Sequence, residues 1–87
     1  MKLKKCLALS ESGFTFDGST GESYTANQVG TRILGLLRDG NDEESIITAL
    51  LKEFETTRPI LEKHLADFFS VLRQHGFFET YEDVHAN

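Results

Sequence analysis

The sequence predicts a small α+β fold, in which a three-stranded antiparallel β-meander is followed by three helices in a winged-helix-like arrangement. Apolar residues alternate with polar ones in the first third of the chain, whereas in the remainder they recur at spacings of three and four residues. The 87 residues suffice for one hydrophobic core and not for two. We therefore expect one domain over residues 1–79, followed by a flexible acidic tail over residues 80–87.

Three short strands account for the first third of the chain. Residues 5–9 and 14–16 carry their larger apolar side chains at every second position, which is the period of a strand. The segment 17–21 contains two glycines and predicts a tight turn. Residues 22–26 then return as the last strand, so that consecutive strands are joined by turns and run antiparallel.

Capping residues mark the starts of three helices in the remainder. Asn27 is a favourable N-cap for the first helix and Asn41 for the second, where Glu44 completes a capping box. Thr57 takes the same place at the third helix, and Pro59 suits the first turn of that helix.

Glycines end two of these helices and interrupt one. Gly40 and Gly76 stand where the first and third helices should end in a left-handed conformation. Gly30 and Gly35 lie inside the first helix, where each costs about 1 kcal/mol relative to alanine, so we expect another element to cross closely there. The two phenylalanines after Gly76 are expected to fold back onto the core. The apolar faces of the second and third helices consist of Ile46, Ile47, Leu50, Leu51, Phe54, Leu61, Leu65, Phe68, Phe69 and Leu72.

The charge of the chain argues against nucleic acid as a partner. Nine Lys and Arg residues stand against fourteen Asp and Glu residues, which gives a formal net charge of −5. Three of the nine cations, Lys2, Lys4 and Lys5, lie near the N-terminus and leave six for the rest of the chain. Affinity for phosphate backbones depends on basic side chains, so we expect no nucleic-acid interface. The uncharged apolar runs are short, so we expect no membrane partner either.

The chemistry-bearing side chains form no catalytic or metal-binding pattern. Cys6 lies in a strand-like run among leucines, where a cysteine is typically a small buried hydrophobic residue. His64, His75 and His85 lack the spacing of zinc ligands, and neither His-x₃-His nor Cys-x₂-Cys occurs. We therefore expect no enzymatic activity, no cofactor and no metal site. A single cysteine cannot form an internal disulfide, which favours a reduced, cytoplasmic protein.

Two segments carry a resemblance to a known family. Thr20-Gly-Glu-x-Tyr-x-x-Asn27 spans the predicted last strand, and Leu72-x-x-x-Gly-Phe77 spans the end of the third helix. With these segments in this order, the chain resembles the PqqD-like family of peptide chaperones, also called RiPP recognition elements, over roughly Leu7 to Glu79. The resemblance implies a module that captures the leader segment of a ribosomally made precursor peptide. It also implies a partner enzyme that modifies this peptide, often a radical-SAM protein.

The expected mode of binding is strand addition at the last strand of the meander, whose outer edge is unpaired. In this strand the small side chains of Ser23 and Thr25 share one face, and Tyr24 points to the other. The third helix should supply a hydrophobic groove for the side chains of the peptide. The predicted peptide-binding residues are Ser23, Tyr24, Thr25, His64, Asp67, Phe68 and Val71. A core role for Phe68 and Val71 stays open, because amphipathic helices often bury a wide face.

Two other functions stay open as well. A winged-helix arrangement is compatible with a regulatory protein that binds DNA through its third helix. That helix offers Arg58, Lys63 and Arg73, which Glu62 and Asp67 offset. The other function is that of an interaction or dimerisation module in an enzyme complex, without a peptide ligand.

Duplex DNA tests the first of these alternatives. Because the acidic body of the chain lacks a cationic face, we expect no saturable binding in the micromolar range at near-physiological salt. The measurement is a fluorescence-anisotropy titration of a labelled duplex at two salt concentrations. Tight binding that weakens steeply as salt is added would contradict this expectation.

Overall fold

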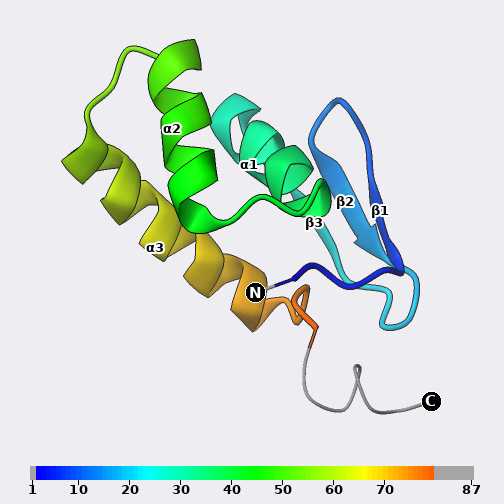
Figure 1. Ribbon diagram of the computed structural model, residues 1–87. Coiled ribbons are helices and arrows are strands. Elements are labelled where there is room, and N and C mark those ends of the chain that lie inside the picture. The colour runs from blue at the N-terminus through cyan, green and yellow to red at the C-terminus, as the bar shows by residue number, and fades with distance from the viewer. Residues whose placement is uncertain (1, 80–87) are drawn as a thin grey trace.

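The computed structural model describes residues 2–79, in which three strands are followed by three helices. The elements are β1 (Leu7–Leu9), β2 (Phe14–Asp17), β3 (Ser23–Thr25), α1 (Gln28–Arg38), α2 (Glu43–Glu53) and α3 (Arg58–Gln74). The expected α+β fold is therefore confirmed. Figure 1 shows α1 between the sheet on one side and α2 on the other, with α3 along the opposite flank of the molecule. The expected tail, residues 80–87, lies outside the described residues.

The sheet is an antiparallel meander in the order β1-β2-β3, as expected. Thr15, on the central strand, stands opposite Leu9 on one side and Tyr24 on the other, and these three side chains face the helices. Phe14 and Phe16 occupy the alternate positions and are 46% and 40% exposed. The two-residue period of β2 is thus confirmed, and its aromatic side chains lie on the outer face of the sheet.

The core joins all three helices to both ends of the described chain. Phe77 is fully buried after the turn at Gly76, which confirms the expected fold-back. The N–H of Lys4 donates to the carbonyl of Phe77 at 2.9 Å, and Leu3 forms a bridge with Phe78. The buried apolar residues are Leu3, Leu7, Ala26, Ile33, Leu34, Leu36, Leu37, Ile46, Ile47, Leu50, Leu61, Leu65, Phe69, Leu72, Phe77 and Phe78. None of the helices within residues 2–79 is long and apolar enough to cross a membrane.

Most of the expected helix boundaries are confirmed. The side chain of Asn27 accepts a hydrogen bond from the N–H of Gly30 at 2.8 Å and caps α1. Gly40 and Gly76 have positive φ angles of 90° and 72°, as expected for residues that end helices. Thr57 stands at the N-cap of α3 in an extended conformation, but its side chain makes no capping hydrogen bond.

The expected cap of α2 is wrong by one residue. Asp42, and not Asn41, is the N-cap, and its carboxylate accepts a hydrogen bond from the N–H of Ser45 at 2.8 Å. The amide of Asn41 instead donates to the carbonyl of Leu36 at 3.0 Å. This carbonyl belongs to the last turn of α1, which has no intrahelical donor left, so Asn41 closes one helix while Asp42 opens the next.

Two other side chains of α2 also differ from expectation. Glu44 forms no capping box, because its carboxylate accepts hydrogen bonds from Arg58 at 2.6 and 2.8 Å and so ties α2 to the start of α3. Leu51, expected on the apolar face, is exposed. The buried face of α2 is narrower than the sequence suggests and consists of Ile46, Ile47 and Leu50.

The two glycines inside α1 have different surroundings. A Cβ atom at Gly30 would lie 3.3 Å from the ring of Phe68 and 3.1 Å from the Cβ of Ala26, so the expected close crossing is confirmed there. A Cβ atom at Gly35 would meet nothing within 4 Å in the described part of the chain. The expectation of a close crossing is therefore wrong for Gly35.

Alanine substitutions separate these two cases. In Gly35→Ala the new methyl group meets no neighbour, so we expect the free energy of unfolding to rise by about 1 kcal/mol. In Gly30→Ala the methyl group presses against Phe68, so we expect no gain or a net loss. Urea denaturation of both variants beside the parent measures the difference. An equal gain for the two variants would contradict the close crossing at Gly30.

Candidate functional site

The outer edge of β3 presents main-chain groups that have no partner within residues 2–79. Hydrogen-bonded pairs alternate along antiparallel strands, and the bond from the Asp17 N–H to the Glu22 carbonyl at 2.8 Å fixes this alternation. The main-chain N–H and carbonyl groups of Tyr24 therefore face Thr15 of β2 and bond with it. The N–H and carbonyl groups of Ser23 and Thr25 point away from β2, toward the open edge. These are the groups that an added strand would bind.

The other edge of the sheet, along β1, is partly covered. The N–H of Leu7 donates to the carbonyl of Lys4 at 3.3 Å, and the carbonyl of Leu7 accepts a hydrogen bond from the Arg38 guanidinium at 2.7 Å. A strand added there would have to displace both contacts. The edge of β3 is therefore the better template for strand addition.

One stripe of α3 lies beside β3. The side chain of Tyr24 leaves β3 toward this helix, and its ring centroid lies 6.2 Å from that of Phe68. His64, Asp67 and Val71 share this side of the helix with Phe68, because they follow at spacings of three and four residues. Phe68 and Val71 are half-buried, and His64 and Asp67 are exposed. Phe68 also packs against the core.

The structure thus places the residues predicted from the sequence on two neighbouring elements. We name this region the β3–α3 surface, and it consists of Ser23, Tyr24, Thr25, His64, Asp67, Phe68 and Val71.

A pocket of about 200 Å³ lies at the His64 end of the β3–α3 surface. Its lining residues are Asn27, Val29, Gly30, Ile33, His64 and Phe68. Gly30 keeps this pocket open, because a side chain there would extend toward the ring of Phe68. Sequence reasoning missed the contribution of α1, since it depends on how α1 crosses α3.

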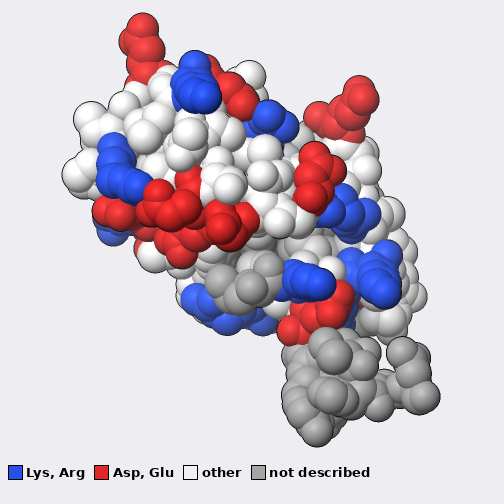
Figure 2. Space-filling model, in the orientation of Figure 1, with Lys and Arg blue, Asp and Glu red and all other residues white. Residues whose placement is uncertain are grey.

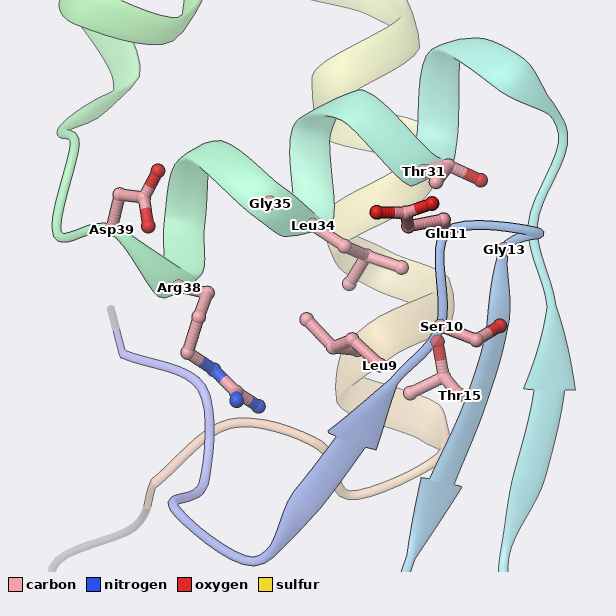
Figure 3. Close-up of a pocket in the computed structure, with 10 residues that line it drawn as sticks. All are labelled: Leu9, Ser10, Glu11, Gly13, Thr15, Thr31, Leu34, Gly35, Arg38 and Asp39. Carbon is pink, nitrogen blue, oxygen red and sulfur yellow. The ribbon is translucent and has the colours of Figure 1, made fainter.

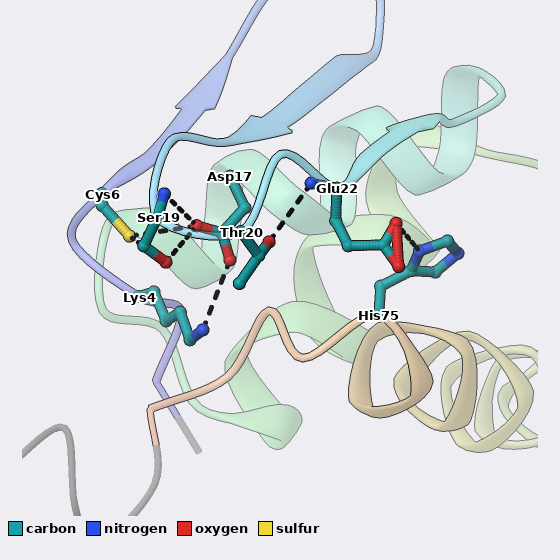
Figure 4. A network of polar contacts seen from close by, with 7 residues as sticks. All are labelled: Lys4, Cys6, Asp17, Ser19, Thr20, Glu22 and His75. Carbon is teal, nitrogen blue, oxygen red and sulfur yellow. Dashed lines mark hydrogen bonds and ion pairs between the residues drawn. The ribbon is translucent and has the colours of Figure 1, made fainter.

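His75 lies at the other end of the β3–α3 surface. Its ring centroid is 5.2 Å from that of Tyr24 and 5.3 Å from that of Phe77, on which it stacks. Its Nδ1 atom lies 3.8 Å from a carboxylate oxygen of Glu22 (Figure 4). Sequence reasoning did not place His75 at the end of this surface, although it follows Val71 by four positions. Extending the same stripe by one helical turn would have found it.

A buried carboxylate holds the turn that precedes β3. Asp17 Oδ1 accepts hydrogen bonds from the N–H of Ser19 at 2.9 Å and from its hydroxyl at 2.7 Å (Figure 4). Cys6 Sγ donates to the same oxygen at 3.4 Å, and Lys4 Nζ lies 3.3 Å from Oδ2. Cys6 is exposed, so the expectation of a buried hydrophobic cysteine is wrong. Its thiol turns toward polar partners in the turn instead of the apolar layer.

These contacts keep Asp17 charged. Burial of the carboxylate on its own would raise its pKa, but hydrogen bonds from Ser19, Cys6 and Lys4 outweigh burial and hold the pKa well below its ordinary value. The side chain is fully buried, so the charge relies on these donors and not on water.

The chemistry of the β3–α3 surface is that of binding an extended chain. It combines main-chain donors and acceptors with half-buried aromatic and aliphatic side chains. Within the described chain, no three His, Cys, Asp or Glu side chains are grouped so that they could hold a metal ion. Figure 2 shows one face of the molecule, on which basic side chains stand among acidic ones.

The sequence matches a known protein family. The family described as "Coenzyme PQQ synthesis protein D (PqqD)" matches residues 11–77, which include all three helices and the β3–α3 surface. A comparison with curated proteins finds no match.

Two solved structures share the fold. One is described as "TbiB1 in Complex with the TbiA(beta) Leader Peptide"; it is 28% identical, with a TM-score of 0.83 over 93% of this chain and 98% of the other. The second is described as "Lasso peptide synthetase B1 complexed with the leader peptide". It is 22% identical, with a TM-score of 0.77 over 91% of this chain and 96% of the other, and supports the fold alone.

The pKa of Asp17 predicts how stability depends on pH. Because this pKa is lower in the folded state, the unfolded state binds more protons as pH falls below about 4, the ordinary value of an aspartate. The contribution of Asp17 is complete above that pH and is lost as pH falls toward the folded-state pKa. We expect Asp17→Asn to lower the free energy of unfolding at pH 7 by about 1.5–3 kcal/mol, and by less near pH 3.

Urea denaturation between pH 3 and pH 7 measures this effect. Asp67→Asn is the matched control, because Asp67 is exposed and its ion pair with Lys63 is weak at 3.6 Å. The same pH dependence in Asp17→Asn and in the parent would contradict the assigned role of Asp17.

Proposed function

Because the chain belongs to the PqqD family, we propose that it is a non-catalytic peptide-binding module for ribosomally made precursor peptides. It captures the leader segment of such a peptide and presents the peptide to a modifying enzyme. The observation that carries this proposal is the open edge of β3 beside α3, where the main-chain groups of Ser23 and Thr25 point outward. TbiB1, whose fold this chain shares at 28% identity, is described in complex with a leader peptide, which supports the same ligand class here.

The leader segment joins the sheet as a fourth strand beside β3. Ser23 and Thr25 each offer one N–H and one carbonyl, and each net hydrogen bond contributes about 0.5–1.5 kcal/mol. Such bonds are independent of the peptide's sequence, so they supply affinity and register but no selectivity.

Selectivity comes from α3 and from the pocket at its His64 end. Successive side chains of an added strand point to opposite faces, so every second side chain of the leader turns toward α3. Those side chains contact Phe68 and Val71, and Asp67 and His64 stand at the exposed rim. The pocket of about 200 Å³ has room for one apolar side chain of the leader.

The proposal also includes a partner enzyme and a cellular compartment. The bound peptide is passed to a modifying enzyme, such as a radical-SAM protein. This is the kind of partner that the family resemblance implies. A reduced cytoplasm suits the free and exposed thiol of Cys6.

An NMR titration with a synthetic leader peptide of a ribosomally made precursor tests the binding surface. We expect the amide signals of Ser23 and Thr25 to shift most within β3, since their N–H groups gain partners. The amide of Tyr24, which faces β2, should shift less. Helix signals should shift at His64, Asp67, Phe68 and Val71. Shifts that cluster instead on α2, over residues 46–54, would contradict this placement.

Two substitutions with matched controls sharpen the test. Thr25→Pro removes an outward N–H without breaking a bond to β2, so we expect about tenfold weaker binding and a folded protein. Thr25→Val keeps the N–H and should bind normally. Val71→Asp should weaken binding by more than tenfold, because the peptide must desolvate the new charge. Ser70→Asp, at the exposed neighbouring position, should not weaken it. Isothermal titration calorimetry gives the affinities, and unfolding of Val71→Asp would assign Val71 to the core.

A further inference from the structure

A second concave surface lies along α1. It is a hollow of about 360 Å³ between the turn that joins β1 to β2 and the C-terminal half of α1 (Figure 3). We name it the α1 hollow, and its lining residues are Leu9, Ser10, Glu11, Gly13, Thr15, Thr31, Leu34, Gly35, Arg38 and Asp39. An adjoining hollow of about 550 Å³ shares Glu11, Thr31 and Gly35 with it.

The α1 hollow and the β3–α3 surface lie on different sides of α1. Thr31, Gly35 and Arg38 follow one another at spacings of four and three residues, so they share one side of the helix. Gly30 and Ile33, which line the pocket beside His64, point to another side. The two regions have no lining residue in common. A partner in the α1 hollow therefore leaves the β3–α3 surface accessible.

Two features of the α1 hollow have no structural explanation in the isolated chain. Thr15 is fully buried, and its hydroxyl has no hydrogen-bond partner anywhere in residues 2–79. Buried hydroxyl groups normally have partners, so the floor of the hollow contains one unsatisfied polar group. Gly35 weakens α1 without relieving any contact, and it leaves the helix backbone open toward the hollow. The open backbone at Gly35 is explained if a ligand approaches α1 closely at this point.

The charges around the α1 hollow indicate a cationic ligand. Glu11 and Asp39 place exposed carboxylates at its rim, at opposite ends of the view in Figure 3. Arg38, the one basic residue in the lining, donates to the main-chain carbonyl of Leu7 and keeps its charge, so the two carboxylates exceed it by one. In the adjoining hollow, Arg32 and Glu53 neutralise each other at 2.7 Å. The rim therefore keeps an excess of negative charge.

The walls of the α1 hollow indicate the rest of the ligand. The side chains of Leu9 and Leu34 extend toward each other across the hollow in Figure 3. Leu34 is buried and Leu9 is half-buried, so the walls are apolar below the charged rim. An aliphatic stem with a cationic head fits this combination, and lysine and arginine have such side chains.

We propose that the α1 hollow binds a lysine or arginine side chain from an extended segment of a partner protein. The stem of this side chain lies between Leu9 and Leu34, and its head donates to the carboxylate of Glu11. The segment crosses α1 at Gly35, where no side chain stands in its way. The domain thereby holds one partner here and keeps the β3–α3 surface for its peptide ligand.

A titration of the ¹⁵N-labelled full chain with short peptides tests this site. The probes are acetyl-Ser-Gly-Lys-Gly-Ser-amide and the same peptide with norleucine or glutamate in place of lysine. We expect saturable shifts at Leu9, Thr15, Leu34 and Gly35 with the lysine peptide, at a Kd of about 1–10 mM. The norleucine peptide should bind at least threefold more weakly, and the glutamate peptide should give no saturable shift.

Two variants and their controls complete the test. Glu11→Gln should weaken binding of the lysine peptide at least threefold. Glu62→Gln, on the exposed side of α3, should leave this binding unchanged. Gly35→Leu fills the hollow and should abolish binding, whereas Ala66→Leu on α3 should leave it intact. If Gly35→Leu does not fold, Glu11→Gln decides alone. Equal binding of the lysine and glutamate peptides, no saturable shift, or an unaffected Glu11→Gln would each overturn the proposal. Because leader binding involves other residues, either proposal can fail without the other.

Discussion

The buried carboxylate of Asp17 is the constraint on which the geometry of the sheet depends. It connects Lys4 and Cys6, which precede β1, with Ser19 in the turn between β2 and β3. A charge without solvent contact is stable only while its donors stay in place, because an unpaired buried charge is costly. The three strands are therefore held in one register. A slip of β3 by one residue would turn the main-chain groups of Ser23 and Thr25 toward β2 and the side chain of Tyr24 away from α3.

The position of α3 depends on a different set of contacts, made by aromatic rings. Tyr24 packs between Phe68 and His75, so one ring from β3 meets two rings of the α3 stripe. The buried Phe77 anchors the chain just after α3, and its ring stacks on that of His75. Strand edge and helix are thus fixed relative to each other before any ligand arrives. A preformed arrangement of this kind lowers the ordering cost of binding.

The sequence predicts the features that depend on neighbouring residues and misses those that depend on distant ones. The caps at Asn27 and Gly40 follow from local hydrogen bonding, and both are confirmed. The choice between Asn41 and Asp42 as the cap of α2 depends on a carbonyl of α1, which no local pattern reveals. Cys6 has its polar partner eleven residues away. The common side of the residues proposed on β3 and α3 follows from their spacing, whereas the pocket between α1 and α3 depends on the crossing of the two helices.

The open edge of β3 also bears on the behaviour of the domain in concentrated solution. Soluble proteins commonly protect such edges with lysine, proline or a bulge, since unpaired edges of two copies can join into one continuous sheet. Neither lysine nor proline occurs in Ser23–Thr25, which leaves the edge able to receive a strand. The shortness of β3, at three residues, and the negative charge of Glu22 beside it are the restraints on self-association that remain. A peptide bound as proposed would occupy the edge, so the ligand would also protect the domain from aggregation.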